Sequence, residues 1–424
     1  MNFSGLHIGV WGTGVVGSSA LRFFKKNGAN LSVYDSNPMP DDIKNFCMKE
    51  HIFIYDQDKL ELFLTNCDYI LPSAGINLKN YRKYHVKFLN EVDIFSQLYK
   101  NRIIAVTGTI GKTTITYLIE KMLVFFGYRA QIGGNLGICL FDLLDTQHEY
   151  DYAVLELSSF QLEHSKIFVP DVAIWTNLFA NHLDRHDTML GYFFAKFPII
   201  KNQTSEHHAL IHNSVKEFLP EGSLVKSSVT YFDSNVSINL ETLITDYKTH
   251  TDHYILLYEL ARILSLDTNK LSEFFDSFET PEHRVQYIGR YLDVDFYDDS
   301  KSTVVEATQG ALRRFHDRNV ILFFGGVSKG VSREHFFTSL PSNIRHICFF
   351  GKESSELNTM CIKTSIPSTD HITLEDAFTH SISLIKPGDV ILFSPGGASF
   401  DLFKDYKQRG QRFQELVKNL KKSL

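Results

Sequence analysis

Cysteine is scarce in this sequence, and its few cysteines are not arranged for a disulfide framework or a zinc site. The 424 residues include five cysteines, an odd number without CxxC spacing. Closely spaced cysteines mark both kinds of site, so the sequence argues against both. We expect reduced, buried thiols in a cytosolic protein at Cys47, Cys67, Cys139, Cys348 and Cys361.

Long apolar runs and an excess of positive charge are also missing. No apolar stretch approaches the ~20 residues that cross a bilayer, and the segment MNFSGLHIGVWG lacks the basic start and apolar core of a secretion signal. Acidic residues outnumber basic residues by 49 to 43, which gives a net charge of -6. We therefore expect no membrane and no nucleic acid as a partner, and a cytoplasmic protein.

The chain does contain enough apolar material for more than one core. Hydrophobic residues make up 43% of its 424 residues, and a chain of this length usually forms two or three domains. Short apolar runs alternate with longer helical patterns, which predicts α/β domains with mainly parallel sheets. We expect strands at His7–Trp11, Leu31–Tyr34, Tyr69–Leu71, Ile103–Thr107, Tyr152–Glu156, Val172–Trp175, Val320–Phe324, Ile347–Phe350 and Val390–Phe393.

Two positions suggest domain boundaries. A new strand and glycine turn begin at RIIAVTGT, near residue 100, after a complete α/β segment. A helical pattern ends near Pro281, and the strand-like stretch YLDVDFYDD follows. We predict three domains, at residues 1–100, 101–283 and 284–424.

The first glycine turn has the spacing of a dinucleotide-binding fingerprint. Gly12, Gly14 and Gly17 follow a strand and precede a helical pattern, and the next strand ends in Asp35. Glycines let the backbone approach a diphosphate, and the acidic residue takes a ribose hydroxyl. Taken alone, the turn fits an NAD-dependent oxidoreductase, another nucleotide diphosphate, or simple packing of a strand against a helix.

The second glycine turn is TGTIGKTT, residues 107–114, again between a strand and a helix. Val106 stands where a generic Walker A loop has its first glycine, so only a shorter TGTxGKT form matches. Backbone amides at the helix start would still face an anion, with Lys112 reaching its outer phosphates and Thr113 offering a hydroxyl to Mg²⁺. The alternative is a tight turn with an exposed lysine.

Metal-binding side chains follow two strands near this loop. Glu156 ends the strand YAVLE, and the segment NHLDRH, residues 181–186, follows VAIWTN. A carboxylate and an imidazole at the carboxyl ends of parallel strands suit Mg²⁺, and His182 is the candidate. We interpret His186 as a structural histidine. A third glycine turn, residues 325–330, carries Lys329, which could bring positive charge to a shared site.

Taken in order, the motifs resemble the Mur ligase family along the whole chain. The closing motif and LELSSFQLE are similar to those of the D-glutamate-adding members, and we find no equivalent of the motif by which other members recognise diaminopimelate or lysine. The motifs are TGTIGKTT, GGNLG (133–137), LELSSFQLE (155–163), NHLDRH, AK (195–196), HR (283–284), DDSKST (298–303), GGVSKG and SPGGASFDLFKDYKQRG (394–410).

The resemblance implies an ATP-dependent, amide-forming ligase of peptidoglycan precursor synthesis. ATP would phosphorylate the carboxylate of UDP-N-acetylmuramoyl-L-alanine, and the amine of D-glutamate would attack the acyl phosphate. It implies a Rossmann-like first domain, a central P-loop-type ATP-binding domain and a Rossmann-like third domain. It also implies two Mg²⁺ ions and closure of the third domain, and we expect a monomer.

The resemblance carries roles onto matching positions. Lys112, Glu156, His182 and Lys196 would be catalytic, and Thr113, Glu156, His182 and a carbamylated Lys196 would hold metal. ATP would contact Gly108, Thr109, Gly111, Lys112, Thr113, Thr114, Arg284, Asp299 and Lys301. The UDP substrate would contact Gly12, Thr13, Gly14, Val15, Val16, Asp35, Ser36, Gly75, Asn135 and Ser158, and D-glutamate would contact Thr303, Lys329, Ser399 and Tyr406.

Some positions depart from the family pattern. Ile110 replaces a usually polar loop residue, and Asn181 stands where an aspartate commonly precedes the histidine. Val15 and Val16 remove a hydroxyl from the first turn. Residues 247–253, YKTHTDH, are a degraded form of the adenine motif, so adenine contacts are not assigned. A folylpolyglutamate synthetase-like enzyme and a non-catalytic relative that binds the UDP-sugar remain alternatives.

Overall fold

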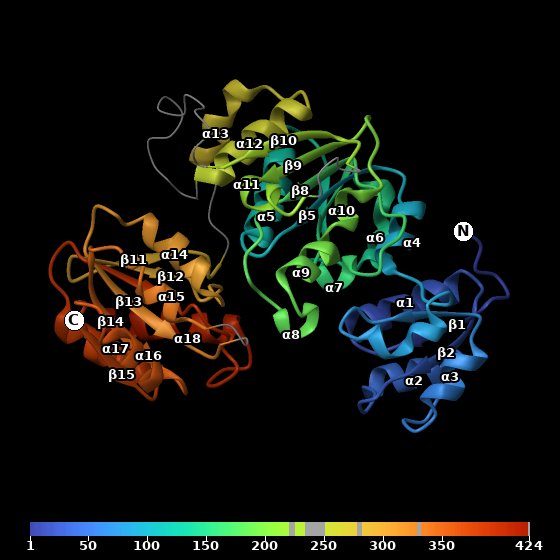
Figure 1. Cartoon of the computed structure of the whole chain (residues 1–424), viewed down its shortest axis with the longest axis horizontal. Helices are drawn as coiled ribbons and strands as arrows, with labels where there is room; N and C mark the ends of the chain where they lie inside the picture. Colours follow the sequence, from blue (N-terminus) through green and yellow to red (C-terminus); the bar gives the residue numbers. More distant parts are fainter. Residues whose placement is uncertain (220–224, 234–250, 278–281, 329–331, 423–424) are drawn as a thin grey trace. The chain divides into compact units, whose positions relative to one another are not determined.

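The computed structural model describes residues 1–219, 225–233, 251–277, 282–328 and 332–422. It contains three sheets flanked by helices (Figure 1). The contacts divide the chain into two compact units, of which the first contains residues 1–179, 185–233 and 259–266 and the second contains residues 180–184, 234–258 and 267–424. The first two sheets belong to the first unit and the third sheet to the second unit.

The first sheet is parallel, with strand order β3-β2-β1-β4. Apolar residues alternate with small ones in β1 and β2, both of which are buried except at their first residues. The strands are β1 (His7–Trp11), β2 (Asn30–Tyr34), β3 (Phe53–Ile54) and β4 (Tyr69–Pro72), and the helices are α1 (Val15–Lys26), α2 (Asp41–Lys49), α3 (Leu60–Asn66) and α4 (Glu91–Leu98).

The second sheet is also parallel, with order β10-β9-β8-β5-β7-β6. Its strands are β5 (Arg102–Thr107), β6 (Ala130–Gly134), β7 (Tyr152–Glu156), β8 (Val172–Trp175), β9 (His208–His212) and β10 (Ser228–Phe232). The helices in this part of the chain are α5 (Lys112–Phe125), α6 (Leu140–Thr146), α7 (Ser159–Leu162), α8 (Leu183–His186), α9 (Met189–Lys196), α10 (Pro198–Lys201), α11 (Asn213–Lys216), α12 (Thr251–Ile263) and α13 (Leu271–Ser277).

The third sheet has order β11-β12-β16-β13-β14-β15, and only the β11–β12 pair is antiparallel. Apolar clusters cover its two faces. Its strands are β11 (Gln286–Tyr291), β12 (Val294–Asp298), β13 (Val320–Gly325), β14 (Ile344–Phe350), β15 (Ser368–His371) and β16 (Val390–Phe393), and its helices are α14 (Val305–Arg313), α15 (Glu334–Phe337), α16 (Ser354–Cys361), α17 (Leu374–Leu384) and α18 (Tyr406–Lys422).

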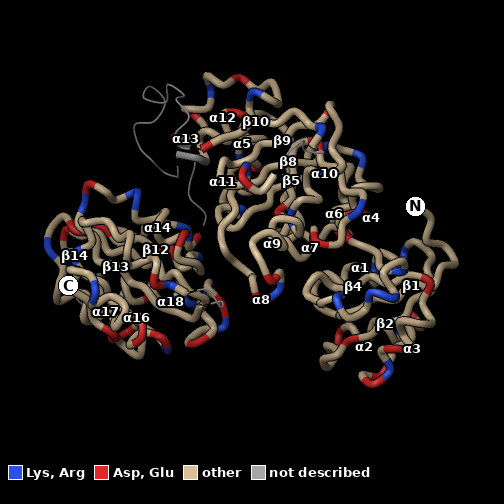
Figure 2. Tube along the Cα trace, in the orientation of Figure 1, with Lys and Arg blue, Asp and Glu red and all other residues tan. Residues whose placement is uncertain are grey.

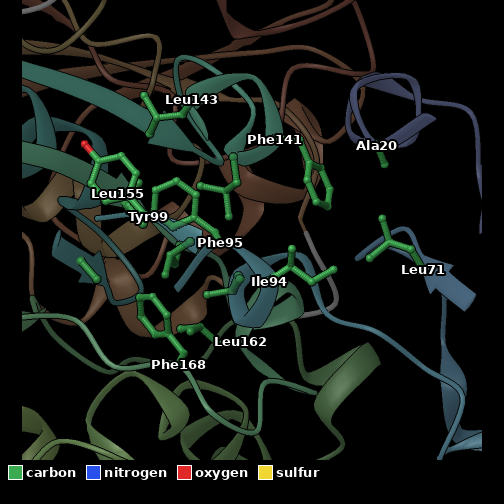
Figure 3. Packing of buried hydrophobic residues seen from close by; sticks show 14 of the residues in the cluster. Ala20, Leu71, Ile94, Phe95, Tyr99, Phe141, Leu143, Leu155, Leu162 and Phe168 are labelled. Carbon is green, nitrogen blue, oxygen red and sulfur yellow. The ribbon is translucent and has the colours of Figure 1, made fainter. Parts of the chain in front are cut away.

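One apolar cluster contains residues from the first and second sheets and from the helices beside them. Phe23 of α1 lies 4.9 Å from Phe141 of α6 between ring centroids, and Ala20 and Leu71 belong to the same cluster as Ile94 of α4 (Figure 3). Burial of this much apolar surface stabilises the first unit as one body.

The predicted α/β class with mainly parallel sheets is confirmed. All five cysteines are buried and free. Within the described part of the chain, no helix combines the length and the apolar character that crossing a bilayer requires. Lys and Arg alternate with Asp and Glu along the trace (Figure 2), in line with the small net charge of -6.

Candidate active site

The turn between β5 and α5 leaves the start of the helix without a side-chain cap. Gly111 precedes α5 with φ 80°, and no side chain caps this helix. A Cβ on Gly108, where φ is 145°, would lie 2.1 Å from Thr176 Oγ1. Asn177, just after β8, accepts hydrogen bonds from the amides of Thr109 and Ile110 at 3.2 and 2.9 Å. The turn can therefore present the start of α5 to an anion.

Lys112 lies over this turn. Its Nζ donates to the carbonyl oxygens of Gly108 and Thr109, at 2.9 and 3.0 Å. An ammonium in this place adds positive charge to the helix start, which favours a polyphosphate.

Lys196, at the end of α9, lies beneath the same turn. It is 1% exposed, and its Nζ donates to Gly108 O at 3.0 Å and Thr107 Oγ1 at 3.2 Å. Burial and the nearby Lys112 ammonium lower the pKa of Lys196 well below its usual range, although the Glu156 carboxylate opposes them. Both effects shift the balance at Lys196 from the ammonium toward the neutral amine.

Glu156 and Asn135 are brought together at the carboxyl ends of β7 and β6. Asn135 donates its side-chain amide to Glu156 Oε1 and its backbone amide to Glu156 O, both at 2.8 Å. Gly134 permits this approach, because a Cβ there would lie 2.5 Å from Glu156 O. Glu156 is 3% exposed. The result is a buried carboxylate whose position is held by a neighbouring strand.

The two histidines of NHLDRH have different surroundings. His182 has φ 53°, and its amide donates to the side-chain oxygen of Asn181 at 3.0 Å. It belongs to the second unit. His186 is buried, its Nε2 lies 3.0 Å from Ser159 Oγ, and its ring packs between Phe160 and Tyr192. Burial lowers the pKa of His186. Packing and a hydrogen bond of this kind suit a structural histidine.

The first glycine turn is tied to the end of β2. Thr13 donates its amide and its hydroxyl to Asp35 Oδ2, both at 2.7 Å. Burial raises the pKa of Asp35, but hydrogen bonds from Asn37 and Thr13 outweigh it and leave the pKa below its usual range. A Cβ on Gly17 would lie 1.9 Å from Gly12 O, whereas Gly14 and Gly75 have open space. Val15 is 79% exposed and Ser36 is also exposed.

Ser158 begins α7 as a capping box with Gln161. The Gln161 amide donates to Ser158 Oγ, and Gln161 Oε1 accepts from the Ser158 amide. Gln161 in turn donates to Glu91 at 2.8 Å. Burial raises the pKa of the Glu91 carboxyl, and the Gln161 hydrogen bond opposes this. Sequence reasoning missed Gln161 and Glu91, although Gln161 stands within the quoted LELSSFQLE motif.

In the second unit, Asp299 is buried near the start of the loop after β12. Its carboxyl accepts from Ser302 and Ser394, and the Val285 amide donates to it at 3.2 Å. Burial raises the pKa of Asp299 to about 6, against the effect of these hydroxyls and of Arg284.

Two predicted residues of this unit meet directly, because Lys301 Nζ lies 3.8 Å from the centroid of the Tyr406 ring. Ser399 is buried, and Thr303 lines a small cavity with Asn181 and Arg333. Lys329 and most of residues 247–253 lie outside the described residues.

Two buried arginines of this unit were not predicted as site residues. Arg333 donates to the carbonyl oxygens of Gly325 and Gly326, at 3.2 Å each. Arg409 donates to Gly397 O at 2.9 Å and Ser300 O at 2.7 Å. They shape the loops after β13 and β16, and Arg409 could have been noticed because it closes the SPGGASFDLFKDYKQRG motif.

The comparisons with known proteins agree with this arrangement. The family description "Mur ligase middle domain" matches residues 106–267, which include the β5–α5 turn, Glu156 and Lys196. UDP-N-acetylmuramoylalanine--D-glutamate ligase of Oenococcus oeni is 29% identical over 99% of this chain and 98% of its own length. The enzyme of that name from Leuconostoc mesenteroides is 29% identical over 100% and 99%. Residues 106–267 thus match the Mur ligase family, and D-glutamate ligases are similar to the chain along its whole length.

The fold of the chain also matches solved structures. MurF ligase from Thermotoga maritima, solved in complex with ADP, shares 17% identity and a TM-score of 0.59, with 99% of this chain and 96% of that chain covered. At this identity the likeness concerns the fold alone. Among the described residues, no group of three His, Cys, Asp or Glu side chains is placed to hold a metal ion.

Proposed function

We propose that this chain joins D-glutamate to UDP-N-acetylmuramoyl-L-alanine with the hydrolysis of ATP to ADP and phosphate. The observation that carries the proposal is the β5–α5 turn with Lys112, Lys196 and Glu156 around it, in a chain that D-glutamate ligases match along nearly their whole length. Such a turn binds a polyphosphate, and the reaction needs one because a free carboxylate has no good leaving group.

The reaction has two steps. A carboxylate oxygen of the UDP substrate attacks the γ-phosphorus of ATP, the bond to the β,γ-bridging oxygen breaks, and ADP leaves. The D-glutamate amine then attacks the acyl carbon, phosphate leaves with the bonding electrons, and the amine loses a proton. Lys112 and the start of α5 neutralise charge on the phosphates during the first step, and Thr109, Gly111, Thr113 and Thr114 belong to the same turn.

Thr113, Glu156, His182 and Lys196 would hold two Mg²⁺ ions. Bound Mg²⁺ would neutralise charge on the phosphoryl oxygens. The buried Glu156 carboxylate is the oxygen donor that Mg²⁺ prefers, whereas an ammonium at Lys196 would repel the ion. The lowered pKa of Lys196 supports a carbamate at this position, because a neutral amine can add to CO₂ and release a proton.

The UDP diphosphate would lie at the first glycine turn, where Gly14 has open space and α1 has no side-chain cap. Asp35, Ser36 and Gly75 would lie near the uracil, and Thr13 holds Asp35 in place. Asn135 and Ser158 would contact the muramoyl part. The turn holds UDP rather than NAD in this proposal, because an oxidoreductase leaves the β5–α5 turn unexplained.

In the second unit, Arg284, Asp299 and Lys301 would contact the ribose and phosphates of ATP. Thr303, Lys329, Ser399 and Tyr406 would hold D-glutamate, a dianion at its two carboxylates, so lysine and hydroxyl groups suit it. The three predicted domains, residues 1–100, 101–283 and 284–424, would bring these parts together in a monomeric, cytoplasmic enzyme.

Mass spectrometry of the reaction products tests this proposal. The purified chain would be incubated with ATP, Mg²⁺, D-glutamate and either UDP-N-acetylmuramoyl-L-alanine or a folate. We expect the mass of the UDP substrate to increase by that of glutamic acid less one water molecule. Addition to the folate alone would favour a folylpolyglutamate synthetase-like enzyme, and binding of the UDP substrate without any product would favour a non-catalytic relative.

A further inference from the structure

Arg185 is a buried side chain that joins three segments of the first unit, and the reaction steps do not use it. It is 9% exposed. Its Nε and one terminal nitrogen donate to Glu163 Oε2 at 3.2 and 3.0 Å. The guanidinium also donates to Gly75 O at 3.4 Å and Ile76 O at 3.0 Å, and lies 5.3 Å from the centroid of the Phe160 ring. It therefore links the loop after β4 to the end of α7.

The loop that Arg185 holds borders the first glycine turn. Ser73 donates its amide to Trp11 O at 2.8 Å, and its hydroxyl lies so close to Gly12 that a Cβ there would be 2.5 Å away. A Cβ built on Gly75 would meet no atom within 4 Å, so the loop is open on that side. Arg185 holds the loop through the carbonyl oxygens of Gly75 and Ile76.

A second cation supports the same connection. Lys79, a little further along the loop, donates to Arg185 O at 3.1 Å and to Asp187 Oδ2 at 2.5 Å. The loop is therefore tied to residues 185–187 at two places. A small cavity lies beside it, lined in part by Ser73, Ile76, Phe160 and Gln161. Gln161 is the residue that positions Ser158, so this cavity lies between the loop and a second part of the proposed UDP-substrate site.

We propose that Arg185 is a positioning residue that holds the Gly75 loop in place for the UDP substrate. The inference rests on the proposed function. The guanidinium satisfies a carboxylate and two carbonyl oxygens at once through its planar set of donors, whereas a lysine ammonium is a single point and cannot reach all three.

Titration calorimetry of ligand binding to the full chain tests the proposal, with the variants Arg185→Ala and Arg185→Lys compared with wild type. The ligands are UDP-N-acetylmuramoyl-L-alanine and, separately, a non-hydrolysable ATP analogue with Mg²⁺. We expect Arg185→Ala to weaken binding of the UDP substrate by about 10-fold or more, and Arg185→Lys to weaken it by less. The Kd for the ATP analogue should change by less than about twofold, since Arg185 contacts no part of the β5–α5 turn.

Arg129→Ala is the matched control, because Arg129 also forms an ion pair, with Asp151 at 2.8 Å, far along the chain from the loop. It should leave both Kd values unchanged. The proposal would be overturned if Arg185→Ala folds and keeps the wild-type Kd for the UDP substrate. It would also be overturned if the variant lost affinity for both ligands equally. If Arg185→Ala does not fold, Lys79→Ala provides the test, because Lys79 is exposed. This variant should weaken binding of the UDP substrate and leave the Kd for the ATP analogue unchanged. A wild-type chain that binds the ATP analogue but not the UDP substrate would overturn the proposed function itself.

Discussion

Lys196 shows how its surroundings set the chemistry of a single side chain. It is buried beneath the β5–α5 turn and has a second lysine nearby, so its pKa is lowered and the balance shifts toward the neutral amine. Sequence alone suggested an exposed helix residue, and only the family resemblance singled Lys196 out. Burial is a property of the folded chain, so the FFAKFP stretch could not reveal it.

Replacement of Lys196 tests the proposed carbamate. Lys196→Ala should lower kcat by about 10²-fold or more, because a negatively charged ligand of the proposed Mg²⁺ would be lost. Short carboxylic acids such as acetate or formate should restore part of the activity by entering the space left by the side chain. Lys201→Ala, an exposed lysine of α10, is the control and should behave as wild type. Failure of every acid to restore activity would contradict carbamylation.

Lys112 should act on ATP without affecting the UDP substrate. Lys112→Ala should lower kcat by about 10²- to 10³-fold, since the ammonium over the turn neutralises phosphate charge. The Kd for the UDP substrate should stay within about twofold of wild type, because that ligand contacts the first glycine turn. Titration calorimetry and steady-state kinetics give both values. Lys121→Ala, on the same helix, is the control, and a loss of affinity for both ligands in Lys112→Ala would show that the turn is misassigned.

At the scale of the element, the strand, turn and helix units were the most predictable features. Each predicted strand is present with similar bounds, because buried parallel strands are short apolar runs. Three of the strands that were not predicted lack that signal: β15 reads STDH, β6 contains two glycines, and β3 has two residues. Arg185 and Asn177 were not predicted because they bind backbone groups far along the chain, and no local pattern encodes those contacts.

The first strand, turn and helix unit gives a test by paired glycine variants. Gly17→Ala would place a methyl group 1.9 Å from Gly12 O, so the turn must shift. We expect a lower thermal midpoint and loss of UDP-substrate binding. Gly14→Ala meets no atom within 4 Å, so the midpoint should stay near wild type while binding weakens. Calorimetry measures both quantities, and equal stability of the two variants would contradict the packing described for this turn.

We expect the stability of the third sheet to depend on pH, because His346, His371 and His380 lie close together there. Burial, and then His380, Arg345 and His371, lower the pKa of His346 to about 4. Above pH ~6.5 the neutral ring is present in folded and unfolded chains alike, so His346 does not change the free energy of unfolding. As the pH falls from ~6.5 to ~4, only the unfolded chain takes up the proton, and stability falls by up to about 3 kcal/mol.

The His346→Gln variant checks this prediction, because a glutamine cannot take up the proton. Scanning calorimetry between pH 7.5 and 5 should show a smaller decrease in thermal midpoint for the variant than for wild type. His148→Gln is the control, since that histidine side chain is 75% exposed and should leave the pH dependence unchanged. An identical decrease in wild type and His346→Gln would exclude His346 as the cause.

At the scale of the whole molecule, the apolar cluster shared by α1 and α6 keeps the first two sheets in one unit. Phe141→Ala should lower stability by about 3–5 kcal/mol, because a buried ring against Phe23 is removed. Phe125→Ala should lower stability much less, because the Phe125 side chain is 39% exposed. Thermal unfolding of both variants measures this, and equal midpoints would contradict a shared core. The sequence predicted three domains but not this contact, because both helices carry ordinary apolar faces.

The proposed reaction of this chain is the addition of D-glutamate to a UDP-linked carboxylate at the expense of ATP. The most direct measurement is phosphate release from ATP by the purified chain with UDP-N-acetylmuramoyl-L-alanine and Mg²⁺. D-glutamate, L-glutamate, glycine, L-alanine, L-lysine and diaminopimelate would be compared as the second substrate. We expect release with D-glutamate alone. Release with a different amino acid would keep the family but contradict the assignment of Thr303, Lys329, Ser399 and Tyr406, and no release with any of them would contradict the ligase itself.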